Sequence, residues 1–106
     1  MASRLSLHDD LKDLIGNNNV YFQPPETVKL KYPCFIYKLV GANAGAADND
    51  IYTYVRRYQL TYVTKDPDSE LVDSIPKYFS KKLKSCRLST HFTSDNLNHY
   101  NYEIYY

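Results

Sequence analysis

The sequence predicts an α+β fold, with a mainly antiparallel sheet and two helices in the order α-β-β-β-α-β-β. Three observations support this prediction. Residues 52–64 alternate with period two and carry aromatic side chains on one face. Residues 99–106 alternate in the same way, and two other segments place apolar side chains at helical spacing. A chain of 106 residues predicts a single domain, residues 1–106.

The first helix is predicted over residues 3–15. Its apolar stripe consists of Leu7, Leu11, Leu14 and Ile15, and Gly16 is placed to end it in a left-handed conformation. A short strand at residues 20–22 follows and stops before two prolines. The next strand starts at Pro33 and has apolar residues on both sides, which predicts that it is covered on both faces or is covered by a partner chain.

Residues 41–50, GANAGAADND, are small and polar, and they lie between two strong strands. They predict a long hairpin loop that is mobile in the free protein. Ten residues exceed the usual hairpin connection, and structureless loops of that length often carry function.

Residues 52–64 are predicted to form the central strand. Their even positions are mostly aromatic or apolar: Tyr52, Tyr54, Arg56, Tyr58, Leu60, Tyr62 and Thr64. The segment DPDSE then stops the strand, and apolar residues from Leu71 to Phe79 recur at helical spacing. Pro76 lies inside this second helical pattern and is expected to end or restart the helix.

Two more strands complete the predicted sheet. Residues 86–93 alternate, a turn with Asp and Asn follows at residues 93–98, and the last strand alternates cleanly. In that last strand the predicted inward side chains are Tyr100, Tyr102, Ile104 and Tyr106, and the outward ones are His99, Asn101, Glu103 and Tyr105.

The composition excludes several classes of protein. The chain has 12 Tyr and 4 Phe but no Trp, and tyrosine serves cores and interfaces alike. A net charge of +1 gives no general attraction to nucleic acid or membranes. We expect Cys34 and Cys86 to be free, buried thiols. No pattern of a signal peptide and no run of about 20 apolar residues is present, so we expect a soluble chain made inside the cell.

No set of residues predicts an enzyme, a cofactor or a metal site. The acidic residues 66–73 favour helix capping over metal binding. Alternation would place Cys86 and His91 on opposite faces, which argues against zinc and against a Cys-His catalytic pair. Arg56 and Arg57 lie between tyrosines, and we favour a subunit interface over an RNA-binding sheet because the net charge is near neutral.

Several motifs together resemble a family of small proteins from tailed bacteriophages, the tail terminator or tail completion proteins, also called minor capsid or tail components. The most specific motifs are YFQPPE at residues 21–26, YPC at 32–34, KDPDSE at 65–70 and SDNLNHY at 94–100. The resemblance covers residues 5–106 and carries no catalytic signature.

The resemblance implies a virion protein at the head-proximal end of the tail, assembled in the host cytoplasm. Subunits would form a hexameric ring that caps the tail tube, ends tail polymerisation and meets the head connector, with DNA passing through the lumen. Under this hypothesis, the candidate interaction residues are Asn43, Ala44, Gly45, Asp48, Tyr54, Arg56, Arg57 and Tyr58. A head-completion protein on the capsid side, a small nucleic-acid-binding module and a small metal-dependent enzyme remain alternatives.

Overall fold

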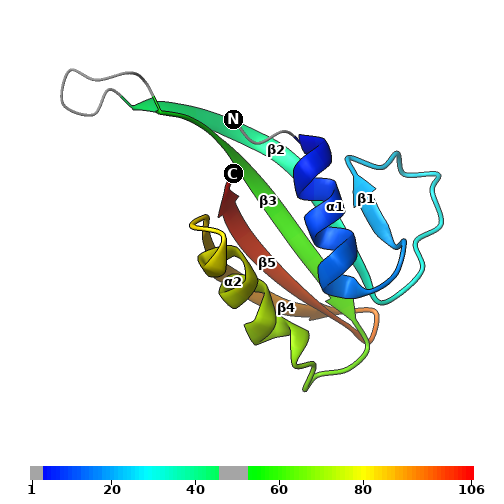
Figure 1. The fold of residues 1–106 in the computed structure, drawn as a ribbon. Helices are drawn as coiled ribbons and strands as arrows, with labels where there is room; N and C mark the ends of the chain where they lie inside the picture. The colour runs from blue at the N-terminus through cyan, green and yellow to red at the C-terminus, as the bar shows by residue number, and fades with distance from the viewer. Residues whose placement is uncertain (1–3, 46–52) are drawn as a thin grey trace.

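A computed structural model describes residues 4–45 and 53–106 (Figure 1). Its elements are α1 (Arg4–Ile15), β1 (Val20–Phe22), β2 (Cys34–Gly45), β3 (Thr53–Thr64), α2 (Leu71–Lys81), β4 (Ser85–Ser94) and β5 (Leu97–Tyr105). The predicted element order and the α+β class are therefore confirmed.

The described strands form one five-stranded sheet in the order β1-β2-β3-β5-β4. The short β1 runs parallel to β2, and every other neighbouring pair is antiparallel. The long β3 is central, since β2 pairs with it on one side and β5 on the other. The sheet is therefore mixed but mainly antiparallel.

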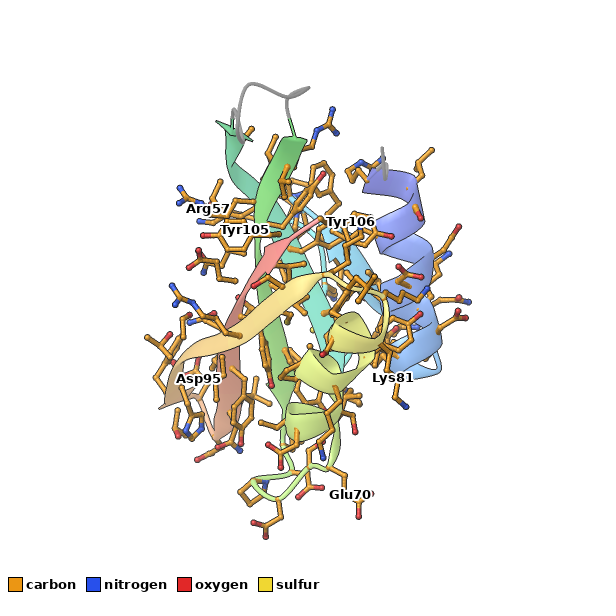
Figure 2. The ribbon with its side chains drawn as sticks, turned by 60° about the vertical axis from the view of Figure 1, so that its left-hand side comes forward. Arg57, Glu70, Lys81, Asp95, Tyr105 and Tyr106 are labelled. Atoms are coloured by element: carbon orange, nitrogen blue, oxygen red, sulfur yellow. The ribbon has the colours of Figure 1, made fainter. Side chains whose placement is uncertain are left out.

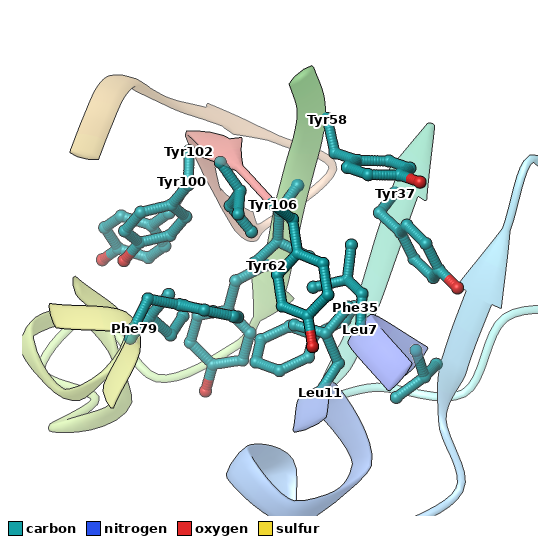
Figure 3. Close-up of a cluster of buried hydrophobic side chains, with 14 residues drawn as sticks. Leu7, Leu11, Phe35, Tyr37, Tyr58, Tyr62, Phe79, Tyr100, Tyr102 and Tyr106 are labelled. Carbon is teal, nitrogen blue, oxygen red and sulfur yellow. The ribbon is translucent and has the colours of Figure 1, made fainter. Parts of the chain in front are cut away.

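Both described helices lie on the same face of the sheet, α1 over β1 and β2 and α2 over β4 and β5 (Figure 1). The side chains between the helices and the sheet form one aromatic core (Figure 3). Leu7, Leu11, Ile75 and Phe79 enter it from the helices. The strands contribute Val20, Phe35, Tyr37, Tyr58, Leu60, Tyr62, Tyr100, Tyr102 and Ile104, and Tyr106 joins them directly after β5.

The predicted alternation of β3 and β5 is confirmed. In β3 the even residues from Tyr58 to Thr64 are buried, and Arg57, Gln59 and Thr61 on the odd face are half-buried. Val63, also on the odd face, is the exception, because it is buried as well. Tyr100, Tyr102 and Ile104 of β5 are buried, as is Tyr106 directly after the strand, and their predicted outward neighbours are half-buried. Period two in the sequence thus identified the helix-covered face of both strands.

The α2 helix corrects the prediction that Pro76 would end it, because the helix continues to Lys81. A proline lacks the N–H that would bond the carbonyl four residues earlier, here Val72. The hydroxyl of Tyr102 donates to that carbonyl oxygen at 2.7 Å. A core tyrosine therefore supplies the hydrogen bond that the proline removes.

The turns use residues that tolerate positive φ. Gly16 ends α1 with φ 75°, as predicted. Asp95 and Asn96 have φ 54° and 63° and form the two-residue turn between β4 and β5, so this turn is shorter than predicted. Positive φ at both central positions suits the right-handed twist of a hairpin.

Two further predictions are wrong. Residues 41–45 are not part of a loop, because β2 continues to Gly45 and pairs with Thr53–Arg57 of β3. β4 does not alternate regularly, because its register shifts between Leu88 and Thr90. That irregularity places Cys86 and His91 opposite Ile104 and Tyr100, and hence on the same, helix-covered face.

Candidate interaction surface

The face of the sheet opposite the helices is covered by no helix of the described chain; we call it the open face. It carries the odd residues of β3 and β5 and their partners on β4. Most of these side chains are half-buried or exposed. Three bands of different chemistry cross it, one after another along the strands.

The first band is charged and reaches across three strands. Arg57 of β3 pairs with Tyr105 of β5, and Figure 2 shows the two side chains next to each other. The Tyr105 hydroxyl donates to Oε1 of Glu103. Arg87 of β4 lies 3.6 Å from Oε2 of the same carboxylate. The Tyr105 hydrogen bond, together with Arg87 and Arg57, lowers the pKa of Glu103 against its partial burial.

The second band is a ladder of polar side chains across the same strands. Thr61 Oγ1 donates to Oδ1 of Asn101 at 2.7 Å, and Nδ2 of Asn101 donates to Oγ1 of Thr90 at 2.9 Å. In the third band Phe92 stacks on His99, with ring centroids 4.6 Å apart and planes 3° from parallel. The open face thus passes from charged to polar to aromatic.

Gly41 shapes the charged end of the open face. A Cβ added to Gly41 would lie 3.1 Å from Nη2 of Arg57, so the guanidinium rests directly against the β2 backbone. Beside it lies a hollow of about 190 Å³ lined by Val40, Arg57, Gln59, Ser89 and Glu103, among others. A side chain at position 41 would force Arg57 to move.

The β2–β3 pair extends beyond the rest of the sheet. β5 pairs with β3 only from Arg57 onward, while β2 and β3 continue to pair up to Gly45 and Thr53. Figure 1 shows this ribbon, residues 42–45 and 53–56, projecting from the sheet. The molecule is correspondingly long, with principal extents of 50 × 29 × 23 Å.

The candidate interaction residues divide into three groups. Asn43, Ala44, Gly45 and Tyr54 lie in the strands of the projecting ribbon. Asp48 lies outside the described residues. Arg57 is on the open face, whereas Arg56 is on the opposite face, where its backbone oxygen accepts a hydrogen bond from the Tyr106 N–H.

Tyr58 is not an interaction residue, which corrects the prediction. It is fully buried in the core, with its ring centroid 6.1 Å from that of Tyr37. Conversely, the sequence did not nominate Arg87, Glu103 or Tyr105 for this surface. The clean alternation of the last strand placed Glu103 and Tyr105 outward, but only the strand order brings them beside Arg57 and Arg87.

A second polar cluster lies inside the molecule and joins both helices to the last residue. Asp10 of α1 accepts hydrogen bonds from Tyr78 at 3.1 Å, Lys82 at 2.8 Å and Tyr106 at 2.7 Å. Burial alone would raise the pKa of Asp10, but these donors, Lys82 foremost, outweigh burial and lower it. The same hydrogen bond raises the pKa of Lys82. This cluster ties the fold together, because both carboxylate oxygens of Asp10 accept hydrogen bonds from within it.

The two cysteines and the candidate metal ligands can be followed among the described residues. Cys34 and Cys86 are free, and burial raises the pKa of each thiol to about 12. No three His, Cys, Asp or Glu side chains within residues 4–45 and 53–106 are placed to hold a metal ion. In the same ranges, neither helix is long and apolar enough to cross a bilayer.

Comparison with known proteins adds no assignment: no model of a known protein family matches this chain, and no curated protein matches it.

Proposed function

We propose that this chain is a structural virion protein that caps the tail tube of a tailed bacteriophage. In this role it ends tail polymerisation and forms part of the interface that joins tail to head, with no reaction catalysed. The proposal rests on the four motifs that resemble tail terminator proteins and on the surfaces described above. Its partners are further copies of itself, the tail tube protein and the head connector.

The projecting β2–β3 ribbon is the observation that carries the proposal. A two-stranded hairpin is marginally stable in water without a third strand or a packed face. Among the described residues, no strand other than β3 pairs with residues 42–45 and no helix covers them. A segment of this kind gains stability when it binds another protein, which suits a subunit that contacts a tube or a connector.

The open face also suits assembly rather than catalysis. Its charged band holds Arg57, Arg87 and Tyr105, and arginine and tyrosine are enriched at protein interfaces. Opposite charges of this kind fix the orientation of a docking partner more than they add affinity. Contacts of one surface with a different surface of the next copy can close into a ring around the tube.

Electron microscopy of lysates tests the proposal directly, using a phage in which this reading frame is stopped early. We expect overlong or ragged tails beside filled heads that have not joined. Tails of normal length beside heads that leak DNA would instead place the protein on the capsid side of the joint. Intact, infectious particles would refute both structural roles.

Nucleic-acid binding is the second candidate, because the open face combines arginines with a stacked aromatic pair. Arg57 and Arg87 lie on the same face as Phe92 and His99, and sheets that bind single strands use such a combination. Glu103 between the two arginines weakens this candidate. Binding to single-stranded DNA that falls steeply with salt, and that is lost in Arg57→Ala, would support it over a purely structural role.

A further inference from the structure

We propose that β4 of one subunit pairs with residues 40–45 of β2 in the next copy, so that the sheet continues across the subunit boundary. The inference rests on the proposed function in one respect, since an assembling subunit makes a second copy the natural partner. The geometry of the two sheet edges carries the rest.

The first edge is β4, Ser85–Ser94. It pairs with β5 on one side and with no described strand on the other. Nine of its ten residues are exposed, and Cys86 alone is half-buried. Such an edge presents a row of backbone N–H and C=O groups that only another extended strand satisfies fully. A ten-residue edge is long by the standard of monomeric proteins, which shorten or cover their edges.

The second edge is the far end of β2. The short β1 covers only Phe35–Tyr37, and the side chain of Gln23 then accepts a hydrogen bond from the Leu39 N–H at 3.3 Å. Beyond that point no described strand lies beside β2 on this side. Residues 40–45 therefore offer a second row of backbone groups, at the opposite side of the same sheet.

The directions of these two strands fit a head-to-tail contact. β2 is antiparallel to β3, β3 to β5, and β5 to β4, so β4 runs opposite to β2. A neighbouring copy in the same orientation would therefore place its β2 antiparallel to β4, in the more stable kind of ladder. The contact joins two different surfaces, and repetition closes it into a ring or extends it.

The two edges also match in apolar side chains. On the helix-covered face, Leu39 of β2 is 45% exposed and Leu88 of β4 is 45% exposed. On the open face, Val40 is 39% exposed and Phe92 is 49% exposed. On each face of the continued sheet, each copy would thus bring one apolar residue to the junction. These four make up half of the exposed large apolar side chains that the structure describes.

The size of the junction favours a ring over a dimer. Six residues of strand extend only about 20 Å. One contact of that length is short for a stable interface, in which each partner buries roughly 800 Å² of surface. A two-fold dimer through β4 alone would have one junction of at most ten residues, whereas a closed ring gives every subunit two junctions. The geometry therefore points to head-to-tail pairing as the arrangement that assembles.

Variants blocked at one edge test the inference. Leu39→Lys with Val40→Lys places charges on the β2 edge, and Leu88→Lys with Phe92→Lys places them on the β4 edge. Leu83→Lys is the matched control, since Leu83 is 93% exposed and lies on neither edge. Native mass spectrometry at high protein concentration should find each blocked variant monomeric, the control assembled like wild type, and a mixture of the two blocked variants forming one-to-one pairs.

Other results would overturn the inference. A variant blocked at β2 that still dimerises by itself would indicate a two-fold β4–β4 contact. A wild-type chain that stays monomeric at every concentration would exclude both arrangements.

Hydrogen exchange on the wild-type chain gives a second test that needs no variant. We expect amides of β4 and of residues 40–45 to gain protection together as concentration rises. Protection of β4 alone, or of neither segment, refutes the head-to-tail contact. The experiments distinguish failure of this inference from failure of the proposed function. If the chain assembles through these edges but phage lacking it stay infectious, only the virion role is refuted. Ragged tails with no protection at either edge would refute only the strand contact.

Discussion

Replacing Asp10 removes the acceptor that joins α1, α2 and β5, and we expect a large loss of stability. The Asp10 side chain is only 11% exposed and its carboxylate receives three hydrogen bonds. Hydrogen bonds to a charged group contribute about 1.5–3 kcal/mol each, but the Lys82 bond is discounted because that side chain is 45% exposed. Taking the two tyrosine bonds at the lower end of that range, we expect Asp10→Ala to lower the free energy of unfolding by about 3 kcal/mol and the Tm by roughly 12–24 °C.

The matched control is Asp9→Ala. Asp9 precedes Asp10 on the same helix and is exposed, so its removal should change the free energy of unfolding by less than about 0.5 kcal/mol. Urea unfolding followed by circular dichroism gives both values. Equal stability losses in the two variants would contradict the argument that the buried hydrogen bonds, and not helix charge, make Asp10 important.

The pH dependence follows from the lowered pKa of Asp10. A carboxyl group whose pKa is lower in the folded state binds its proton more weakly there than in the unfolded chain. Its contribution is therefore complete above the unfolded pKa, about 3.9, and is lost as pH falls through the folded value. The stability gap between wild type and Asp10→Asn should be constant from pH 7 to about pH 5 and should shrink below about pH 4. A gap that stays constant down to pH 2 would refute this.

Three further changes have defined outcomes. Tyr102→Phe leaves the Val72 carbonyl without its donor and should lower the free energy of unfolding in urea by about 1–2 kcal/mol. Tyr32→Phe on the surface should leave that free energy unchanged. Gly16→Ala places a side chain at φ 75° and should cost about 1 kcal/mol, and an unchanged Tm would contradict the strain argument. Alkylation of Cys34 and Cys86 at pH 8 should be far slower than that of a free cysteine peptide, because burial raises both pKa values to about 12; rapid labelling of the native chain would contradict it.

The sequence predicted the sheet well where one face is apolar and the other is not. The even residues from Tyr58 to Thr64 in β3 and from Tyr100 to Ile104 in β5 are buried as expected, because period two survives where the helices cover one face. Prediction from the sequence was wrong where long-range strand pairing overrides the local composition. Residues 41–45 are small and polar, as in a loop, yet they pair with β3 because that partner is a strong strand.

Pro76 and the irregularity in β4 could not be predicted for related reasons. The helix tolerates Pro76 only because Tyr102, distant in sequence, donates to the freed carbonyl. The shift in β4 changes which side chains share a face, and no residue type marks it in the sequence. The charged band of the candidate surface was missed similarly, since strand order and not sequence spacing brings Arg57, Glu103 and Arg87 together.

The hydrogen bond between Asp10 and Tyr106 joins residues 96 positions apart, which bears on how the chain folds. Closing so long a loop costs entropy before any contact compensates for it, and folds dominated by such contacts form in milliseconds to seconds. The β2–β3 hairpin is local, and hairpins form within about 1–10 μs. We therefore expect the β2–β3 ribbon to form first and α1 to pack last. A subunit that can contact partners would then exist transiently before its core is fully packed.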